Sequence, residues 1–463
     1  MDIQFLGATG RVTGSCYLIR VREHQVLLEC GLIQGSQEDE AENGQPFPFD
    51  ASKIDAAVLS HSHIDHSGRL PLLMKQGFTG PIYAQHASQA LCAIMLRDSG
   101  YLHEKDAEWA NRKRRRKGLP LVSPLYTQAD GEAVMDQFHG LDYGVRREIL
   151  PGFSVRLRNA GHILGSAIVE IWLEEGEKKC KLVFSGDLGF ADAPVMPDPE
   201  TIQEADLVLL ESTYGDRLHR EAQSTLDELQ EVFTAGNSTH GNIIIPAFAV
   251  GRTQDLLYLM TEHFDEWRIG EYQVFLDSPM AIEATTTYAQ FRNQLDTELF
   301  RPGTREPNLR NLTMSRTSED SMAINLIETG AIVIAASGMC TGGRIRHHLK
   351  HNLWKPESQV VIVGYQARGT LGRRLVDGAE IVRIFGEEIR VNARIHTVGG
   401  LSAHADQAGL INWYRAFTDA PPVYLVHGEP EAQAVLARTI EKQTGRRPTI
   451  PKLNDSLDLS ELA

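Results

Sequence analysis

Short apolar runs recur along the first part of the chain, and most of them indicate strands. Residues 3–6, 16–21 and 25–28 are β-type runs separated by glycine-rich or charged turns, which predicts an antiparallel opening. The run 56–59 is continuously apolar, as expected of a buried strand. Residues 86–118 are polar with sparse apolar positions and end at a Gly-Leu-Pro turn, so we expect a long helix there.

Strands resume at residue 153, and the pattern changes after residues 207–215. The runs 153–157, 167–173 and 182–184 are again typical of strands. Beyond residue 215 strands alternate with helices, which predicts a parallel α/β unit. The expected strands are 242–246, 274–276, 331–336 and 360–364, and the expected helices are 252–264, one after Pro279, 344–351 and 371–376.

The last part of the chain, after about residue 390, has a third pattern. Two short strands are expected around 396–398 and 423–426, with helices at 407–417 and 431–444. No fixed-period repeat is present in the sequence. A chain of 463 residues is too long for one simple core and suits two domains of ordinary size.

Composition restricts the class of protein. A hydrophobic content of 42% with 23% charged residues is that of a soluble globular chain, and no run approaches the roughly 18 apolar residues that a membrane helix needs. The N-terminus has no basic region followed by an apolar core, so we expect a cytoplasmic protein. The five cysteines are scattered and form no Cys-x-x-Cys pair, which argues against a disulfide framework and a thiolate metal site.

Charge is unevenly distributed along the chain. The formal net charge of −15 argues against nucleic-acid binding by the surface as a whole, because phosphate contacts need lysine and arginine. Positive charge is concentrated in one run, Arg-Lys-Arg-Arg-Arg-Lys at 112–117, near the acidic residues Glu104, Asp106 and Glu108. A solvated helix face and a nucleic-acid contact are both consistent with this run, so the chemistry of the site must decide.

The stretch Ser-His-Ser-His-Ile-Asp-His-Ser-Gly at 60–68 carries the strongest chemical signal. Three imidazoles and a carboxylate fall within six positions directly after the apolar run 56–59. His61 and His63 are expected to project together from the carboxyl end of that strand, while Asp65 and His66 follow on the turn. Imidazole combined with carboxylate favours an open, water-activating zinc site over a closed structural one.

Further metal-competent residues follow later strands. His162 lies in Ala-Gly-His-Ile-Leu-Gly-Ser after the strand 153–157, and Asp187 lies in Ser-Gly-Asp after the strand 182–184. Together the candidates supply two mixed shells, in which Asp187 is the bridge. The first shell comprises His61, His63, His162 and Asp187, and the second comprises Asp65, His66, Asp187 and His427. Two cations roughly 3.5–4 Å apart lower the pKa of a shared water and stabilise both oxygens of a phosphoester displacement.

These motifs resemble those of a known family. The His-x-His-x-Asp-His run, the Gly-His, the Ser-Gly-Asp and the late histidine are similar to the metallo-β-lactamase fold of metallohydrolases. Glu-Ser-Thr-Tyr-Gly at 211–215, Leu-Ser-Ala-His-Ala-Asp at 401–406 and Leu-Val-His-Gly-Glu at 425–429 resemble three further motifs of the β-CASP subgroup of nucleases. That subgroup includes the pre-mRNA 3′-end-processing endonuclease and the bacterial ribonucleases of type J. The resemblance spans essentially the whole chain, with the motifs in the family's order.

The resemblance implies an α/β fold, a metallo-β-lactamase αββα sandwich with an inserted β-CASP α/β domain. The sandwich would comprise residues 1–210 and 391–463, and the insertion residues 211–390. The resemblance also implies that His427 is the last metal ligand and that His404 pairs with Glu211 as a general acid unit. A histidine beside a carboxylate can be protonated near neutral pH and can protonate a leaving alkoxide, which supports this role.

One position departs from the family pattern. Glu-Cys-Gly at 29–31 stands where the family usually has Asp-Cys-Gly. An aspartate there would support a metal ligand from behind rather than bind the metal. Glu29 is one methylene longer, so its hydrogen bonds are left open, and Glu29 is not counted among the predicted ligands.

Two glycine-rich turns in the middle part, 336–344 and 364–374, follow strands and precede helices. Backbone amides at such helix N-termini bind phosphate readily. Neither turn matches the G-x-G-x-x-G pattern of dinucleotide sites, and arginines accompany both, so we interpret them as contacts to a nucleic-acid backbone. The predicted substrate-binding residues are Arg252, Ser337, Gly338, Arg344, Arg368, Arg373 and Arg374.

The leading interpretation is a metal-dependent ribonuclease. It would hydrolyse phosphodiester bonds of single-stranded RNA with a hydroxide activated by two zinc ions, manganese being the alternative metal. We expect an endonuclease in RNA processing or decay, with a 5′–3′ exoribonuclease as the alternative. The predicted catalytic residues are Asp65, Glu211 and His404. The expected partner is RNA and not a membrane, and a homodimer stays open.

Two rival functions are less well supported. A metallohydrolase of the same fold acting on a small ester would not need so long an insertion before its last ligand. A catalytically inactive scaffold in an RNA-processing complex would be expected to have lost ligands, whereas all candidates are present. These candidates are His61, His63, Asp65, His66, His162, Asp187 and His427.

Overall fold

The computed structural model describes residues 1–239, 241–297, 299–300, 303–304, 307–364, 366–367 and 369–462. The chain divides into two compact units. The first comprises Met1–Asp192, Asp198–Leu218 and His404–Ala463, and the second comprises Ala193–Pro197 and His219–Ala403. The first unit is therefore assembled from separate segments of the chain, with most of the second unit lying between them in the sequence.

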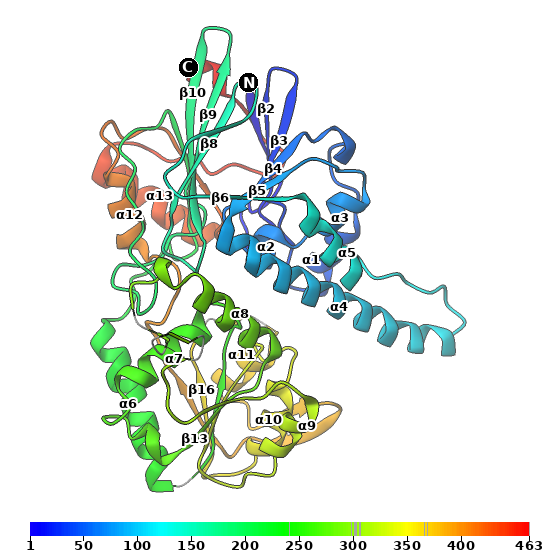
Figure 1. Cartoon of the computed structure of the whole chain (residues 1–463), viewed down its shortest axis with the longest axis vertical. Helices are drawn as coiled ribbons and strands as arrows, with labels where there is room; N and C mark the ends of the chain where they lie inside the picture. The colour runs from blue at the N-terminus through cyan, green and yellow to red at the C-terminus, as the bar shows by residue number, and fades with distance from the viewer. Residues whose placement is uncertain are drawn as a thin grey trace. The chain divides into compact units, whose positions relative to one another are not determined.

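Two β-sheets form the centre of the first unit (Figure 1). In neighbour order, one sheet contains β21 (Ser456–Asp458), β1 (Asp2–Phe5), β2 (Tyr17–Val21), β3 (His24–Leu28), β4 (Ala56–Val58), β5 (Ile82–Gln85) and β6 (Phe138–Leu141). The other contains β20 (Val423–Val426), β11 (Leu207–Glu211), β10 (Lys178–Phe184), β9 (Ala167–Glu175), β8 (Phe153–Asn159) and β7 (Arg147–Leu150). The predicted antiparallel opening is confirmed, because β1, β2 and β3 pair antiparallel.

The two sheets pack face to face around a shared apolar core. Alternate residues of β2, Tyr17 and Ile19, lie in this core together with Val169 and Ile171 of β9. Leu18, which lies between the two β2 residues in the sequence, belongs to a second core. β2 is therefore buried on both faces, which explains why its residues other than Arg20 are apolar.

Helices cover the outer faces of the two sheets, as Figure 1 shows. Leu73 and Cys92 contribute helical side chains to the core of the first sheet, and Leu410 and Leu436 contribute to that of the second. The αββα sandwich predicted from the sequence is confirmed. The helices of this unit are α1 (Gln37–Ala41), α2 (Ile64–Ser67), α3 (Leu70–Lys75), α4 (His86–Arg116), α5 (Gln128–Ala133), α12 (Gln407–Arg415) and α13 (Pro430–Thr444).

The second unit is built around a parallel sheet, as the alternation of strands and helices predicted. In neighbour order its strands are β14 (Leu312–Met314), β13 (Gln273–Leu276), β15 (Ala331–Ala335), β12 (Ile243–Pro246), β16 (Gln359–Ile362) and β19 (Arg394–Thr397). A separate hairpin joins β17 (Ile381–Ile384) and β18 (Glu387–Arg390). The helices are α6 (Ala222–Thr239), α7 (Arg252–Glu262), α8 (Pro279–Gln290), α9 (Ser318–Ile324), α10 (Ile345–Asn352) and α11 (Leu371–Val376).

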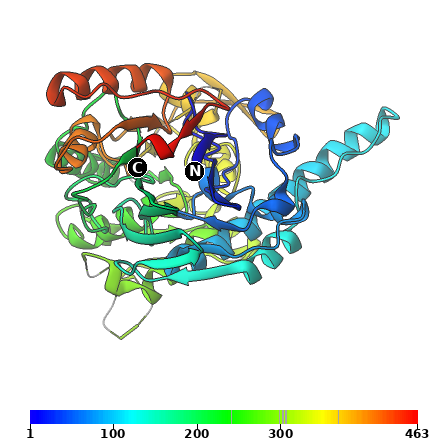
Figure 2. The same cartoon turned by 90° about the horizontal axis from the view of Figure 1, so that it is seen from above.

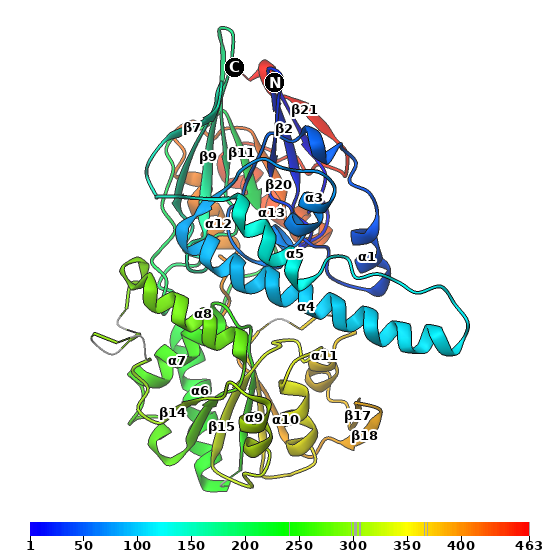
Figure 3. The same cartoon turned by 45° about the vertical axis from the view of Figure 1, so that its right-hand side comes forward.

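Helices lie on both sides of this parallel sheet. Figure 3 shows α6 and α7 on one side and α9 and α10 on the other. Ile324 of α9 and Leu349 of α10 pack on Val333 and Val360 of the sheet. The arrangement is that of an α/β unit whose strands are covered on both faces.

The compact units do not coincide with the sequence-based boundaries, because residues 211–218 group with the first unit and residues 193–197 and 391–403 with the second. β19 lies beyond residue 390, where we expected the sandwich to resume, yet Val360 and Val361 of β16 pair with Ile395 and His396 of this strand. β19 therefore belongs to the sheet of the second unit, which continues to Ala403. The sandwich resumes with the segment that carries α12, α13 and β20.

Candidate metal centre

The predicted metal-binding stretch follows β4 and is held by the backbone around it. His61 and His63 come directly after the strand, whereas Asp65 and His66 lie on the short helix α2 and not on a turn as expected. Neighbouring loops fasten α2, because Ser15 N–H donates to the Asp65 carbonyl and Cys30 N–H donates to the His66 carbonyl, at 2.9 and 2.8 Å. The imidazole positions thus depend on loops that lie far away in the sequence.

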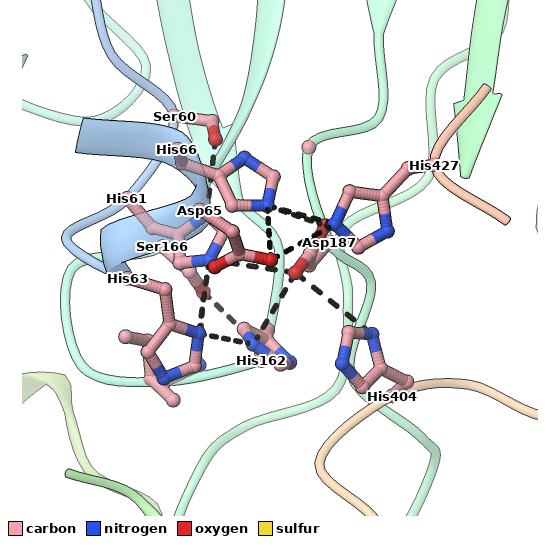
Figure 4. A network of polar contacts seen from close by, with 12 residues as sticks. Ser60, His61, His63, Asp65, His66, His162, Ser166, Asp187, His404 and His427 are labelled. Carbon is pink, nitrogen blue, oxygen red and sulfur yellow. Dashed lines mark hydrogen bonds and ion pairs between the residues drawn. The ribbon is translucent and has the colours of Figure 1, made fainter. Parts of the chain in front are cut away.

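A first group of candidate ligands surrounds His63. Its Nδ1 lies 3.1 Å from His61 Nε2 and 3.1 Å from His162 Nε2. Asp187 completes the group, and one ligand atom from each of these residues lies within 4.8 Å of every other. Figure 4 shows the imidazoles converging from separate segments, as the predicted first shell requires.

A second group comprises Asp65, His66 and His427, again with ligand atoms within 4.8 Å of one another. His66 Nε2 lies 3.0 Å from His427 Nε2, and the latter atom lies 3.4 Å from Asp65 Oδ2. His427 comes from the end of β20, far from the other two in the sequence, and its backbone is in the left-handed region with φ 52°. The structure thus brings the late histidine to the predicted second shell.

Asp187 lies between the two groups (Figure 4). Its Oδ2 is 3.4 Å from His61 Nε2 and 3.6 Å from His162 Nε2. Its Oδ1 is 3.3 Å from His66 Nε2 and 3.7 Å from His427 Nε2. Each oxygen therefore faces a different group, which is the geometry of a bridging ligand.

The chemistry of these side chains fits zinc. Ligands 2.0–2.1 Å from a tetrahedral zinc ion lie about 3.3 Å apart, close to the distances between the nitrogen atoms in both groups. Burial lowers the pKa of His61 well below its usual value and that of His63 to about 4, so both imidazoles are neutral at pH 7, the form that binds metal. Asp187 Oδ1 is buried and accepts no hydrogen bond from the described residues, which leaves it available to a cation.

Electrostatics keep Asp187 ionised in this buried place. Burial alone would raise the pKa of its carboxyl, but the neighbouring His427 and His66 hold that pKa well below the usual range. Burial would also raise the pKa of Asp65, but the neighbouring His66 and His427 lower it to about 2. Both carboxylates therefore carry negative charge at neutral pH and can bind cations.

Glu29 supports the second group from outside. It is buried, with His66 Nδ1 2.5 Å from its Oε2, and it accepts hydrogen bonds from Ser60 N–H and Ser60 Oγ at 2.6 and 2.8 Å. A carboxylate on the far nitrogen of a histidine fixes the tautomer that presents the other nitrogen to a metal. The longer side chain of Glu29 therefore makes the contacts that the sequence left open.

Other supporting residues were not predicted. Thr213 Oγ1 lies 3.1 Å from His427 Nδ1, Ser60 Oγ lies 3.0 Å from His61 Nδ1, and Ser166 Oγ accepts from His162 N–H at 3.0 Å. Each serine or threonine lies within one of the sequence motifs, although no role was predicted for it. Small hydroxyl residues are too common for sequence spacing alone to distinguish these three.

His404 and Glu211 lie together at the edge of the cluster. His404 Nδ1 is 3.3 Å from both Glu211 Oε1 and Oε2, and 3.9 Å from Asp187 Oδ2. Glu211 is fully buried and also accepts from Leu188 N–H at 2.7 Å. Burial alone would lower the pKa of His404, but the charge and hydrogen bond of Glu211 raise it to about 9.

His404 stands apart from the candidate ligand groups among the described residues, whereas Glu211 also falls in a group with Asp187 and His427. The Glu211 carboxylate is already used by His404 and by the Leu188 amide. The pair therefore has the geometry of a protonated histidine oriented by a buried carboxylate.

The predicted substrate-binding residues all belong to the second unit, and their environments differ. Arg252 is buried, 3.6 Å from Asp255. Arg344 binds Asp277 at 2.6 Å and two backbone carbonyls. Both guanidinium groups thus have partners within their own unit.

The remaining predicted contacts lie on or near α11 and the turn before α10. Ser337 Oγ accepts from the amides of Thr341 and Gly342 at 3.0 and 3.2 Å, so it organises the turn that contains Gly338. Arg373 and Arg374 are exposed, and Arg373 pairs with Asp377 at 2.9 Å. Arg368 lies outside the described residues. The role of these residues in RNA binding stays a prediction.

Three family models match the chain. The model of the metallo-β-lactamase superfamily matches residues 9–239, that of the β-CASP domain matches 253–375, and that of the Zn-dependent metallo-hydrolase RNA specificity domain matches 388–451. These ranges cover the segments from which the candidate ligands come.

Similar proteins carry related names. Ribonuclease TTHA0252 of Thermus thermophilus is 38% identical, over 95% of this chain and 96% of its own length. The transcription termination factor FttA of Methanocaldococcus jannaschii is 29% identical, over 98% of this chain and 71% of its own length. An RNase J-like protein of the same organism is 28% identical, over 95% of each.

A solved structure shares the fold. The crystal structure of a protein of unknown function from Enterococcus faecalis V583 covers 98% of this chain and 99% of its own chain, with a TM-score of 0.53 and 12% identity. At this identity the likeness shows the fold alone. Among the described residues, no helix is long and apolar enough to cross a membrane.

Proposed function

Because this chain belongs to the β-CASP family of metallo-β-lactamase-fold nucleases, we propose that it is a metal-dependent ribonuclease that cuts single-stranded RNA internally. The observation that carries the proposal is the double cluster around Asp187, whose two oxygens face separate groups of buried imidazoles. The names of the similar ribonucleases and the match to an RNA specificity domain support RNA as the substrate.

The proposed ligands divide into two sets that share Asp187. His61, His63 and His162 would hold one zinc ion, and Asp65, His66 and His427 would hold the other. When bound, two such ions lower the pKa of a shared water and stabilise the charge that develops on the phosphate oxygens. Burial keeps the imidazoles of His61 and His63 neutral, and Ser60, Glu29 and Thr213 orient the rings of His61, His66 and His427.

His404 is the proposed general acid. A phosphodiester displacement expels an alkoxide, which leaves more readily when it receives a proton. With a pKa of about 9, His404 is protonated at neutral pH, and Glu211 orients the ring through Nδ1. Its other nitrogen, Nε2, is then the atom that would donate the proton.

An assay with end-labelled substrates tests the endonuclease. Single-stranded RNA and DNA of matched sequence, each with and without a 5′-phosphate, are incubated with the zinc-loaded protein and the products are sized. Internal fragments from RNA, independent of the 5′ end, are the expected result. Successive mononucleotides that depend on the 5′ end would identify a 5′–3′ exoribonuclease instead, and no RNA cleavage would overturn the proposal.

A second assay tests the general acid. His404→Ala should retain zinc but slow RNA cleavage by on the order of 10²–10⁴-fold. The defect should shrink on an activated aryl phosphodiester, whose leaving group needs no proton. Glu211→Gln should behave alike, and the double variant should be little slower than either single variant, because the two residues act as one unit. Loss of zinc in His404→Ala would instead make His404 a ligand.

The exposed arginines of α11 are proposed to contact the RNA backbone. Each contact to a phosphate of a single strand contributes roughly 0.7 to the slope of log affinity against log salt. Replacing Arg373 and Arg374 with glutamine should lower that slope accordingly. An unchanged slope would place the phosphate contacts elsewhere.

A further inference from the structure

The distal half of α4 extends away from the core of its unit. The helix has 31 residues, so it is about 45 Å long. Its first half packs on the first sheet through residues such as Cys92 and Leu96, but from residue 101 to 116 only Ala107 is buried. Figure 2 shows this part, in cyan, running out beyond the sheets of the first unit. We call residues 101–117 the α4 arm.

Polar contacts hold the arm in place without burying it. Asn111 forms two hydrogen bonds with the Val122 backbone, at 2.8 and 2.9 Å. The segment that follows the helix therefore runs back alongside it. Arg114 Nε donates to the Pro120 carbonyl. Helical stability in proteins comes mostly from packing of an apolar face, and the arm has almost none. Its extension is therefore not explained by the folding of the unit.

Aromatic and cationic side chains recur at every fourth residue along the arm. Tyr101, Lys105, Trp109, Lys113 and Lys117 are exposed, and successive members are neighbours in a row that winds about 40° around the helix at each step. Tyr101 and Trp109 are 45% and 60% exposed, and about 12 Å of helix separates them. Lys113 Nζ lies 3.5 Å from the centre of the Trp109 ring, and Lys105 Nζ lies 5.5 Å from that of Tyr101.

The positive charge of the arm is not neutralised by its neighbours. Every residue from 112 to 117 is arginine or lysine, and in the described part of the chain none of them forms an ion pair. Glu108, four residues before Arg112, instead bonds Lys105 at 3.0 Å. Cations in the last turn of a helix interact favourably with the helix dipole, but this interaction falls off within one turn and does not account for the whole run of cations. The arm is thus strongly basic in a protein of net charge −15.

We propose that the α4 arm binds single-stranded RNA and holds part of the substrate strand away from the scissile bond. Aromatic faces that stack on bases, beside cations that contact phosphates, are the usual means of gripping a single strand without sequence preference. Protein–protein interfaces are depleted in lysine but enriched in arginine, tyrosine and tryptophan, so binding to a second protein is the outcome that the experiment must separate from RNA binding. The proposal rests on RNA being the substrate.

The arm is connected to the site through the sheet. α4 begins directly after β5, which runs parallel to β4, the strand that leads to His61 and His63. The start of the helix therefore lies at the edge of the sheet that carries the metal cluster. A long RNA could contact both the arm and the site, whereas a small phosphodiester could reach only the site.

Two variants test the proposal in the zinc-loaded full chain. One replaces Arg112, Lys113, Arg115 and Arg116 with glutamine, and the other is Trp109→Ala. The matched control replaces exposed cations outside the arm with glutamine and changes the net charge equally, at Lys53, Lys179, Arg447 and Lys452. KM and kcat are measured on a long single-stranded RNA over a range of salt concentrations, and on an activated aryl phosphodiester.

The arm variants should have a higher KM for the long RNA, by about five-fold or more for Trp109→Ala. The charge variant should also lower the slope of log KM against log salt concentration by roughly 0.7 for each lost phosphate contact. The control should match wild type, and all proteins should cleave the aryl substrate equally. Equal RNA kinetics in the arm variants and the control would overturn the proposal. So would a wild-type dimer that the arm variants dissociate, because the arm would then bind a second copy. If the wild-type protein cleaves the aryl substrate but not RNA, the result contradicts the proposed ribonuclease function rather than the role of the arm.

Discussion

Among single residues, Asp187 is the candidate ligand that lies between the two groups. Its two oxygens face separate histidine pairs at 3.3–3.7 Å, so no neighbour can replace it. His63, by contrast, belongs to the first group alone among the groups that the described residues form, with its Nδ1 beside His61 and His162. Replacing either residue removes a candidate ligand, but the loss of bound zinc should be larger for Asp187 than for His63.

Metal analysis of two variants tests this difference. His63→Ala should lower the zinc content from two ions toward one, Asp187→Ala should lower occupancy of both sites, and both should abolish RNA cleavage. The measurement is elemental analysis of the purified protein together with the cleavage assay. His139→Ala, an exposed histidine on β6, is the control and should keep full zinc and activity. Full zinc content in Asp187→Ala would contradict the bridging role.

Glu29 should matter for metal affinity rather than for the number of ligands. Glu29→Gln removes the charge behind His66 Nδ1, and loss of such a partner typically costs 10–100-fold in metal affinity. Titration with a competing chelator measures the effect. Glu170→Gln is the control, because Glu170 is an equally buried carboxylate that binds Arg156 and Lys181 outside the cluster. The control should lower stability and leave zinc affinity unchanged; an equal loss of affinity in both would contradict a specific role for Glu29.

Single residues also show which parts of the candidate site could be predicted from the sequence. The four candidates at 61–66 could be chosen because imidazoles and carboxylates at such close spacing are rare without a metal, whereas His162 and Asp187 were chosen from their places after strands and His427 from the family resemblance. Glu29 and Thr213 were not assigned their roles, because each meets its histidine only after distant strands pair. Thr213 lies near Glu211 in the sequence but contacts His427, and that contact follows from the parallel pairing of β11 with β20.

At the scale of elements, the close fit between α2 and the loop at Gly31 positions the ligands. A methyl group on Gly31 would lie 1.6 Å from the Asp65 carbonyl oxygen and 2.8 Å from the Ser15 nitrogen. These are backbone atoms, so the helix itself would have to move. Asp65 and His66 would move with it.

Gly31→Ala should therefore destabilise the protein and weaken zinc binding together. Overpacking of this kind costs about 1–3 kcal/mol in free energy of unfolding, and the clash here is with backbone rather than with a flexible side chain. Thermal unfolding and zinc content measure the two effects. Gly44→Ala is the control, because a methyl group there would meet nothing within 4 Å. Normal zinc content in Gly31→Ala would show that α2 adapts.

Strands with strong apolar patterns were predicted well, and some short strands with polar sequences were not. β9, β12 and β15 are buried along most of their length, so their sequences are nearly continuous apolar runs. β18 is mostly exposed and reads Glu-Glu-Ile-Arg, which has no strand pattern. β19 was predicted as a strand, but its half-exposed residues gave no indication of which sheet it joins.

At the scale of the whole molecule, the cluster joins separate segments of one unit. His61 comes from the first segment, Glu211 from the second, and His404 and His427 from the last. Metal bound between them links chain segments that are far apart in the sequence. The candidate ligands all belong to the first unit, so metal binding should stabilise that unit and not the parallel sheet of the second.

Calorimetry with and without a chelator tests this asymmetry. We expect separable unfolding transitions for the two units, of which only one responds to metal. A ligand at 100 times its dissociation constant stabilises the folded state by about 2.7 kcal/mol, which corresponds to a fall of about 5–10 °C in Tm on its removal. Asp187→Ala should already show the lower Tm and should not respond to chelator. Equal shifts in both transitions would mean that the units unfold together, and the absence of any shift would mean that the cluster binds no metal of consequence for folding.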